Sequence, residues 1–269
     1  MRHADGVTID PWTTADPYEP FMGRWSRQLA ADVVSWLAPP PGARWLDVGC
    51  GTGAASAAVL GSAAPSSLVG VDPSAAYVEA ASGQHANPRA TFRVGNADNL
   101  PVPDSSVDEV ISGLVLNFVP DPVAAIGEMR RALVSGGRVT AYVWDYADGM
   151  KMLRHFWDAV ITHDPAAAGL DEGVRFPLCL PGALERCFVA AGLVEVGGQP
   201  VEIVTAFDGF EDYWRPFLGG QGPAPGYCAS LSTSDLDALR ELVRATLPAE
   251  ADGSIRLPAR AWAVTGRSA

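Results

Sequence analysis

The chain has 269 residues, of which 48% are apolar, so it is long enough to bury the core of one large domain. Its formal net charge is −12, and it contains no run of lysine or arginine; the densest basic cluster is Arg130-Arg131. This charge repels phosphate backbones, so it argues against a nucleic-acid partner and favours a small-molecule partner.

The cysteines and the apolar segments indicate a reducing compartment and no membrane. Cys50, Cys179, Cys187 and Cys228 show neither C-x-x-C pairs nor zinc-ligand spacing, so we expect free thiols and no metal site. The chain opens without a secretory pattern, and no apolar run approaches roughly 18 residues. We therefore expect a cytoplasmic protein without a membrane partner, and the oligomeric state is left open. Among the 19 Lys and Arg residues only Lys151 is a lysine, a bias that suggests a bacterial source.

Residues 1–40 are predicted to form a loose arm followed by a helix. Residues 1–20 contain three prolines and little periodicity, whereas apolar residues recur at helical spacing over 21–37, including Leu29 and Val33. Pro39-Pro40-Pro41 ends this helix because proline lacks the amide hydrogen and clashes with the preceding turn.

A repeating strand–helix pattern follows. Short apolar runs predict strands at 44–48, 67–71, 91–94, 107–112 and 138–144, and the segments between them predict helices at 54–60, 74–82 and 123–133. Ser74 is a suitable N-cap for the second helix, and Gly136-Gly137 is expected to end the third. Strands that alternate with helices form a parallel sheet covered on both faces.

Beyond Trp144 the strict alternation stops. Helices are predicted at 149–163, 181–191, 210–218 and 234–247, the last capped by Ser234, and strands at 192–205 and 254–265. The predicted fold class is therefore α/β: a doubly wound, mostly parallel, seven-stranded, Rossmann-like sheet with an N-terminal helical lid. Residues 149–269 complete the sheet and carry helical cap insertions at about 149–180 and 207–250.

The strongest motif is a glycine turn directly after the first predicted strand. Residues 46–53 read Leu-Asp-Val-Gly-Cys-Gly-Thr-Gly, and Asp72 ends the next strand about 20 residues later. Glycine lets a ligand lie against the backbone, and a carboxylate at this place can accept both hydroxyls of a ribose. Because Ala54 would satisfy the looser dinucleotide pattern, the glycines alone are ambiguous. Asp47 is a poor neighbour for phosphate, which favours a nucleoside without a pyrophosphate. Residues 41–148 are therefore predicted to form the cofactor-binding core.

Several motifs between residues 18 and 145 together resemble the class I S-adenosylmethionine-dependent methyltransferases. They are LDVGCGTG (46–53), VGVDPS (69–74), GNADNLPVPDSSVDEV (95–110), LNFVPDP (116–122) and RRALVSGGRV (130–139). Within this family, the chain is similar to the broad group of ubiquinone/menaquinone-type and small-molecule methyltransferases. The resemblance implies S-adenosyl-L-methionine as the cofactor and S-adenosyl-L-homocysteine as the product.

The resemblance also implies which residues contact the cofactor. Gly49 and Gly51 would pass beside its methionine part, Asp72 would hold the ribose, and Asp98 would accept a hydrogen bond from the adenine amine. The remaining expected contacts are Pro73, Asn96, Ala97 and Asn117, together with Tyr18, Arg24 and Trp25 of the lid. Arg24 suits the cofactor carboxylate because a guanidinium is a planar fork of donors.

Most of these residues also have a purely structural interpretation. Asp72 can stabilise the start of the following helix, Asp98 can be an ordinary loop carboxylate, and Arg24 can form a salt bridge. Asn117 stands where the family often has a histidine beside the substrate, so assistance by histidine at this place is in doubt. The resemblance supplies no assigned base.

The remaining candidates lie in the predicted cap. His155 and His163 can share a helix face, and either can act as a general base near neutral pH or be a structural histidine; with Asn117 they are the weak catalytic candidates. Eight aromatic residues can wall a substrate pocket or fill the core: Trp144, Tyr146, Phe156, Trp157, Phe176, Tyr213, Trp214 and Phe217.

The hypothesis that follows is an enzyme that transfers a methyl group to a small-molecule acceptor through oxygen, nitrogen or carbon. One alternative is a catalytically silent, methyltransferase-like protein that only binds the cofactor. A nicotinamide-dependent oxidoreductase is disfavoured, because Ala147 stands four residues before Lys151, where a Tyr-x-x-x-Lys pair would need tyrosine.

Overall fold

The computed structural model describes residues 19–219 and 222–269, so the predicted site residue Tyr18 lies outside the described part. The described chain begins with a single π-helical turn, η1 (Glu19–Gly23), which continues into α1 (Arg24–Leu37). The buried face of α1 includes Trp25, Leu29 and Val33, at the spacing of four that stacks side chains on one helix face. The predicted lid helix is therefore present, with an irregular first turn.

A seven-stranded sheet forms the centre of the molecule, in the order β3-β2-β1-β4-β5-β7-β6. Its strands are β1 (Arg44–Val48), β2 (Ser67–Asp72), β3 (Ala90–Val94), β4 (Val107–Gly113), β5 (Leu133–Trp144), β6 (Val194–Phe207) and β7 (Ile255–Arg267). The first five strands are parallel, and β7 runs antiparallel to both β5 and β6. The predicted doubly wound, mostly parallel sheet is confirmed.

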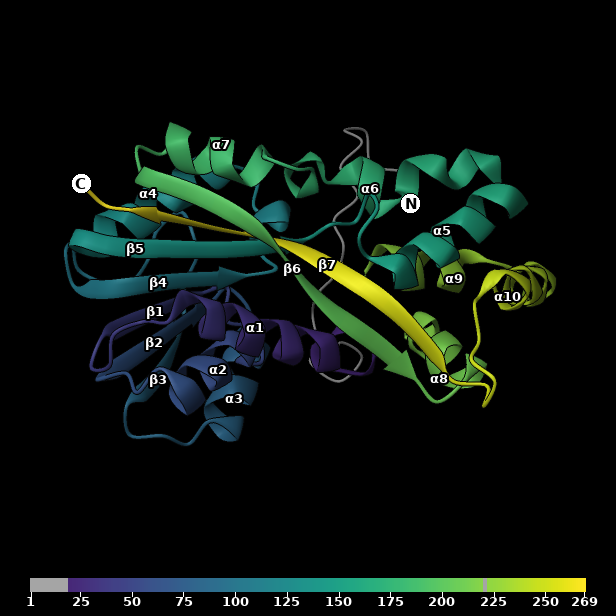
Figure 1. Cartoon of the computed structure of the whole chain (residues 1–269), viewed down its shortest axis with the longest axis horizontal. Helices are drawn as coiled ribbons and strands as arrows, with labels where there is room; N and C mark the ends of the chain where they lie inside the picture. The colour runs from purple at the N-terminus through teal and green to yellow at the C-terminus, as the bar shows by residue number, and fades with distance from the viewer. Residues whose placement is uncertain (1–18, 220–221) are drawn as a thin grey trace.

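Helices cover both faces of the sheet (Figure 1). On one side lie α1, α2 (Ala54–Ser62) and α3 (Ala75–Gln84), and on the other lie α4 (Pro122–Ala132) and α7 (Ala183–Ala190). Ser74 caps α3 as predicted, since its side chain accepts a hydrogen bond from the amide of Tyr77. This layering brings the carboxyl ends of β1, β2 and β4 to one edge, where ligands bind in open α/β sheets.

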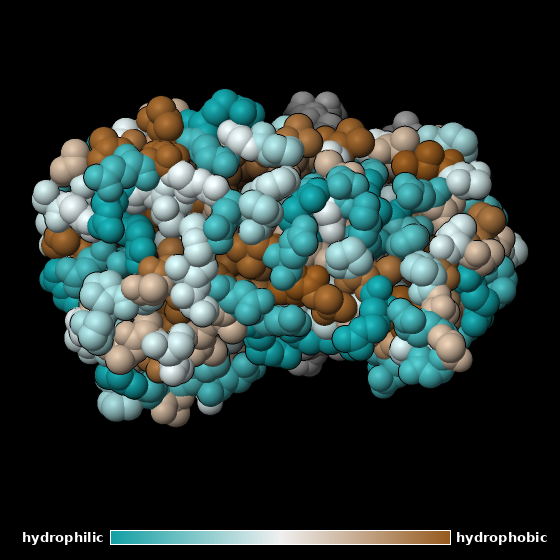
Figure 2. All heavy atoms as spheres, in the orientation of Figure 1, coloured by the Kyte–Doolittle hydropathy of each residue, from teal (hydrophilic) through white to brown (hydrophobic). Residues whose placement is uncertain are grey.

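The other helices gather at the far ends of β6 and β7 (Figure 1). They are α5 (Lys151–His163), α6 (Glu172–Arg175), α8 (Phe210–Trp214), α9 (Pro223–Ser230) and α10 (Thr233–Thr246), with short 3-10 turns η3 (Pro165–Leu170), η4 (Pro177–Cys179) and η5 (Arg215–Leu218). Phe156 and Phe217 stack at 4.4 Å between ring centroids, and Tyr213 contacts Phe217 at 5.3 Å. These aromatic rings form a core of the cap's own. Figure 2 shows apolar atoms gathering on this face between the sheet and the cap, where β6 and β7 cross the view.

Three local predictions differ from the structure. The glycine pair 136–137 does not end a helix but lies within β5, as an irregular stretch between the pairs Val107↔Leu133 and Glu109↔Arg138. Ser232 rather than Ser234 caps α10, because its hydroxyl accepts the Asp235 amide at 3.2 Å. Helix α9 was not predicted. Its Pro223 is tolerated because amides in the first helical turn have no intrahelical acceptor, so the missing amide hydrogen costs no hydrogen bond.

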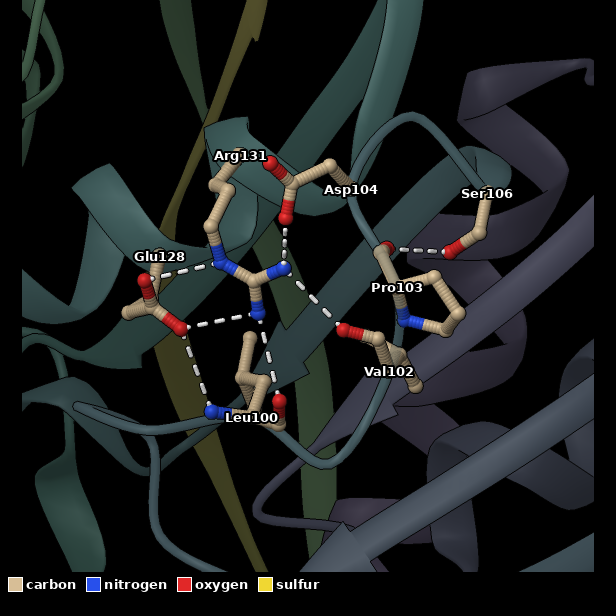
Figure 3. A network of polar contacts seen from close by, with 7 residues as sticks. All are labelled: Leu100, Val102, Pro103, Asp104, Ser106, Glu128 and Arg131. Atoms are coloured by element: carbon tan, nitrogen blue, oxygen red, sulfur yellow. Dashed lines mark hydrogen bonds and ion pairs between the residues drawn. The ribbon is translucent and has the colours of Figure 1, made fainter.

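Arg131 of α4 anchors the loop between β3 and β4 (Figure 3). Its guanidinium donates to both oxygens of Glu128 at 2.9 Å and to Asp104 at 2.6 Å. It also donates to the carbonyl oxygens of Val102 and Leu100 at 3.0 and 3.2 Å. Since these contacts span residues 100–104, one side chain holds the second half of the loop that carries Asp98.

We expect Arg131→Met to lower the free energy of unfolding by about 2–3 kcal/mol, because it leaves Glu128 and two carbonyl groups without their charged donor. Urea unfolding measures this difference. The matched control is Arg130→Met, since Arg130 is exposed and, among the described residues, its side chain donates only to the Gly192 carbonyl, at 3.1 Å. Its expected loss is below about 1 kcal/mol. Equal losses in the two variants would contradict the anchoring role of Arg131.

A buried acid lies in the cap. Glu172 is 2% exposed and accepts a hydrogen bond from the indole nitrogen of Trp157, beside the ion pair of Arg154 with Asp171. Burial raises the pKa of Glu172 to about 7, against the opposing effect of the Trp157 hydrogen bond. In the unfolded chain a glutamate has a pKa of about 4.3, so the folded protein binds the proton on Glu172 more tightly than the unfolded chain does.

This pKa predicts a pH-dependent stability. The stabilisation from the protonated Glu172 is fully present below about pH 4 and is lost as the pH rises to about 7. We therefore expect the unfolding free energy of the wild type to fall by roughly 2–3 kcal/mol relative to Glu172→Gln between pH 5 and pH 8. Urea unfolding of both proteins at the two pH values gives this difference. A constant difference between them would contradict the raised pKa.

Within the described residues, no helix has both the length and the apolar character needed to cross a bilayer.

Candidate functional site

A pocket of about 240 Å³ opens at the carboxyl edge of the sheet. Its walls come from the N-terminal turn, the glycine turn and the ends of β2, β4 and β5. The lining residues are Met22, Ser26, Asp47, Gly49, Cys50, Gly51, Thr52, Ala54, Ala55, Asp72, Pro73, Ser74, Tyr77, Gly113, Leu114, Val115, Phe118, Tyr142, Trp144 and Tyr146. The pocket thus brings together the predicted site residues Gly49, Gly51, Asp72 and Pro73.

The glycine turn presents bare backbone to this pocket. Gly49, Gly51 and Gly53 all have positive φ, at 72°, 52° and 94°. The amides of Gly49 and Cys50 both donate to the carbonyl of Val71, at 2.7 and 3.0 Å, which holds the turn against the end of β2. A Cβ at position 49 would lie 2.4 Å from the side chain of Val115. Glycine is therefore needed at position 49 both for its φ and for the close approach.

Asp72 is joined to the glycine turn by its side chain. One carboxylate oxygen accepts the Gly51 amide at 3.0 Å, and the other accepts the Ser74 amide at 2.9 Å. Burial raises the pKa of Asp72, and the hydrogen bonds from Ser74 and Gly51 oppose that shift. Since a carboxylate has about four lone-pair sites, both oxygens keep capacity for further hydroxyl donors.

Asp47, at the end of β1, is a site residue that sequence reasoning used only as an argument against phosphate. It is 1% exposed, lines the pocket, and accepts the Ser56 hydroxyl at 2.6 Å. Burial raises its pKa to about 7, although the Ser56 hydrogen bond favours the ionised form. The feature of the sequence that could have identified Asp47 is its position directly before the glycine turn.

The loop with Asn96, Ala97 and Asp98 starts beside Asp72, because the Gly95 amide donates to the Asp72 carbonyl at 3.1 Å. Asn96 and Asp98 are exposed and Ala97 is half-buried, and these three residues do not line the pocket. Their contacts with the cofactor stay a prediction.

Arg24 and Trp25 face the cap rather than the pocket. The Arg24 guanidinium lies 3.3 Å from the Asp212 carboxylate and above the rings of Trp25 and Phe207, at 4.3 and 4.9 Å from their centroids. Neither Arg24 nor Trp25 lines the pocket, whereas their neighbours Met22 and Ser26 do. The salt-bridge interpretation of Arg24 thus describes the observed geometry, and the carboxylate-binding role stays untested.

The three weak catalytic candidates are not among the residues that line the pocket. Asn117, in the turn η2 (Leu116–Phe118), is half-buried, and its side-chain nitrogen has no partner among the described residues. Both histidines lie on α5: burial lowers the pKa of His155, and His163 lies 3.9 Å from Asp235. No histidine is present among the lining residues of the described chain. A catalytic role for these three residues stays a prediction.

The end of β4 turns sharply into the pocket. Leu114 has a φ of 63°, in the left-handed region that a leucine rarely occupies, and its amide donates to the Tyr142 carbonyl at 2.8 Å. Strained backbone of this kind costs about 1–3 kcal/mol and clusters at functional sites. Here the turn places Leu114 and Val115 in the pocket wall, beside the end of β5.

Two of the eight predicted aromatic residues, Trp144 and Tyr146, line the pocket, and the sequence analysis missed Tyr77, Phe118 and Tyr142. The signal was the Tyr-x-Trp-x-Tyr spacing at 142–146. Phe176 does not line the pocket but packs against two residues that do. Its ring centroid lies 5.1 Å from that of Phe118 and 5.8 Å from that of Tyr146. Within the described part of the chain, all lining residues lie between 22 and 146, so the cap borders the pocket without lining it.

Comparisons with known proteins agree with this architecture. Residues 46–141 match the family described as "Methyltransferase domain". A malonyl-[acyl-carrier protein] O-methyltransferase of Hahella chejuensis is 34% identical over 48% of this chain and 50% of its own length. A demethylmenaquinone methyltransferase of Roseiflexus sp. is 34% identical over 42% of this chain and 48% of its own. The chain thus spans about half the length of these curated relatives.

A solved structure shows the same fold. It is the phosphoethanolamine N-methyltransferase 2 of Haemonchus contortus, in complex with phosphomonomethylethanolamine and S-adenosylhomocysteine, with a TM-score of 0.57 and 17% identity over 94% of this chain and 56% of that one. The strand order and the pocket at the carboxyl edge define a Rossmann-like α/β protein. Within that class, residues 46–141 match a methyltransferase domain.

Proposed function

We propose that the chain transfers a methyl group from S-adenosyl-L-methionine to a small-molecule acceptor and releases S-adenosyl-L-homocysteine. The observation that carries this proposal is the meeting of Gly51 and Asp72 in one pocket, at 3.0 Å between amide nitrogen and carboxylate oxygen. Bare backbone beside a carboxylate at a strand end suits a nucleoside. The named acceptors of the relatives differ from one another, so they support only the coarse class.

The described residues fit an adenosyl group in the proposed roles. Gly49 and Gly51 offer a surface without side chains for the methionine part, and Asp72 keeps lone pairs for the two ribose hydroxyls. Asp98, with Asn96 and Ala97, is proposed to meet the adenine from the loop that Arg131 anchors. The bound cofactor supplies a methyl group on a sulfonium, which is already an activated leaving group.

The protein's own contribution is then positioning and exclusion of water. Met22 and Ser26 close the pocket from the lid, and the Arg24–Asp212 pair ties that lid to the cap. The cap segments at 149–180 and 207–250 are proposed to control access to the pocket by holding the N-terminal lid in place. One such contact joins Phe21 of the lid to Phe217 of the cap, whose ring centroids lie 5.6 Å apart. The net charge of −12 favours a partner other than a nucleic acid.

Isothermal titration with S-adenosyl-L-methionine and S-adenosyl-L-homocysteine tests cofactor binding, and release of S-adenosyl-L-homocysteine across a panel of small acceptors tests turnover. We expect saturable binding with one cofactor per chain. Binding without turnover on any acceptor would support the catalytically silent alternative. Absence of binding would refute the proposal.

A further inference from the structure

The third glycine of the glycine turn, Gly53, faces away from the pocket. It has a φ of 94°, yet it is not among the lining residues, whereas its neighbours Thr52 and Ala54 are. A Cβ at position 53 would instead lie 2.4 Å from the imidazole ring of His85. The missing side chain at Gly53 therefore makes room for His85 rather than for a ligand.

His85 reaches the turn from the end of α3. It is the C-cap residue of that helix, it is half-buried, and its ring lies near Phe92 of β3, with 6.1 Å between ring centroids. Its Nε2 atom lies 3.2 Å from the Thr52 carbonyl oxygen. Because a carbonyl oxygen only accepts, this contact is a hydrogen bond when Nε2 carries the imidazole proton.

The Thr52–Gly53 peptide group is thereby held at both of its polar atoms. The Gly53 amide donates to the Cys50 carbonyl at 2.8 Å, and the Thr52 carbonyl accepts from His85. Since a peptide group is planar, hydrogen bonds at both atoms fix its orientation. Gly53 is also the N-cap of α2, and its carbonyl accepts the Ala57 amide at 2.8 Å. The orientation of this peptide therefore sets the direction in which α2 starts.

The start of α2 belongs to the pocket wall. Ala54 and Ala55 line the pocket, as Gly51 and Thr52 do. The first amides of a helix have no intrahelical acceptor and point out of its N-terminus. Because backbone and small side chains form this wall, its shape follows the course of the main chain. A small rotation of a peptide group here would displace the atoms that contact a ligand.

We propose that His85 is a positioning residue for the cofactor. Its Nε2–H group holds the Thr52 carbonyl and thereby keeps the glycine turn and the start of α2 in the shape that binds S-adenosyl-L-methionine. This inference rests on the proposed function, because it takes the cofactor to lie against that turn. His85 does not line the pocket, so it acts through the Thr52–Gly53 peptide. The turn is then supported from both ends of α3, by Asp72 before the helix and by His85 after it.

Two variants separate the hydrogen bond from the packing. His85→Leu keeps an apolar group near Phe92 but removes the donor, whereas His85→Gln keeps an N–H donor of comparable reach. We expect His85→Leu to weaken S-adenosyl-L-homocysteine binding about five-fold or more, and His85→Gln to stay within about two-fold of the wild type. Isothermal titration measures both affinities, and urea unfolding shows that both variants are folded. An affinity in His85→Leu that is no weaker than in His85→Gln would overturn the proposal.

Spectra of the wild type test the same contact without relying on the fold of a variant. Long-range proton–nitrogen correlation spectra show which ring nitrogen of each histidine carries a proton, and the signals of His85 are those that a His85 variant lacks. We expect a proton on Nε2. An unprotonated Nε2 would overturn the proposal, because it could not donate to the Thr52 carbonyl.

The two proposals fail in different ways. Absence of S-adenosyl-L-homocysteine binding to the wild type would refute the proposed function, and hydrogen exchange in the free proteins would still test His85. The Gly53 amide, which donates to the Cys50 carbonyl, is expected to exchange about five-fold faster in His85→Leu than in His85→Gln. Normal binding by the wild type with equal affinity in His85→Leu would refute the role of His85 alone.

Discussion

Asp72→Ala is expected to weaken the binding of S-adenosyl-L-homocysteine by on the order of 1–3 kcal/mol, which is roughly 5- to 150-fold in the dissociation constant. The substitution removes the proposed acceptor of the ribose hydroxyls. It also frees the Gly51 and Ser74 amides, which the carboxylate now holds at 3.0 and 2.9 Å, so the glycine turn itself loosens. Isothermal titration measures the affinity, and urea unfolding measures the stability of the same variant.

The matched control is Asp121→Ala. Asp121 also begins a helix, since its side chain accepts the Ala124 amide at 2.9 Å, but it does not line the pocket. If Asp72 served only to start α3, both variants would lose about 1 kcal/mol of stability and neither would lose affinity. An affinity loss confined to Asp72→Ala supports the ribose role, and unchanged affinity removes Asp72 from the site.

Gly49→Ala is expected to lower the free energy of unfolding by about 2–4 kcal/mol and to weaken cofactor binding at least ten-fold. Two effects add. The φ of 72° is strained for alanine, and the new Cβ would lie 2.4 Å from the side chain of Val115. Relief of that contact moves the turn or Val115, and both line the pocket. Urea unfolding and calorimetric titration measure the two losses.

Gly42→Ala separates the two effects. Gly42 has a φ of 83°, but a Cβ there would meet nothing within 4 Å. Its expected cost is about 1–2 kcal/mol from backbone strain alone, without a change in affinity. A Gly49→Ala variant that behaves like Gly42→Ala would show that the approach of Val115 has no consequence. Partial recovery of stability and affinity in the double variant Gly49→Ala/Val115→Ala would confirm that the contact with Val115 contributes to both losses.

The strand–helix alternation through Trp144 and the meeting of the glycine turn with Asp72 were predictable from the sequence, because both depend on local patterns. A buried strand is a short apolar run, and parallel strands bring successive carboxyl ends to one edge. The bond from the Gly51 amide to Asp72 joins residues only 21 apart, within one strand–helix–strand unit.

The tertiary structure alone decided which side chains face one another across long separations. Arg24 meets Asp212, 188 residues away, and a single helix gives no sign of that partner. Likewise, local spacing does not tell whether an aromatic residue lines the pocket, as Tyr142 does, or packs in the cap core, as Phe156 does. Periodicity identifies the buried face of an element, but only the packing of distant elements determines what that face is buried against.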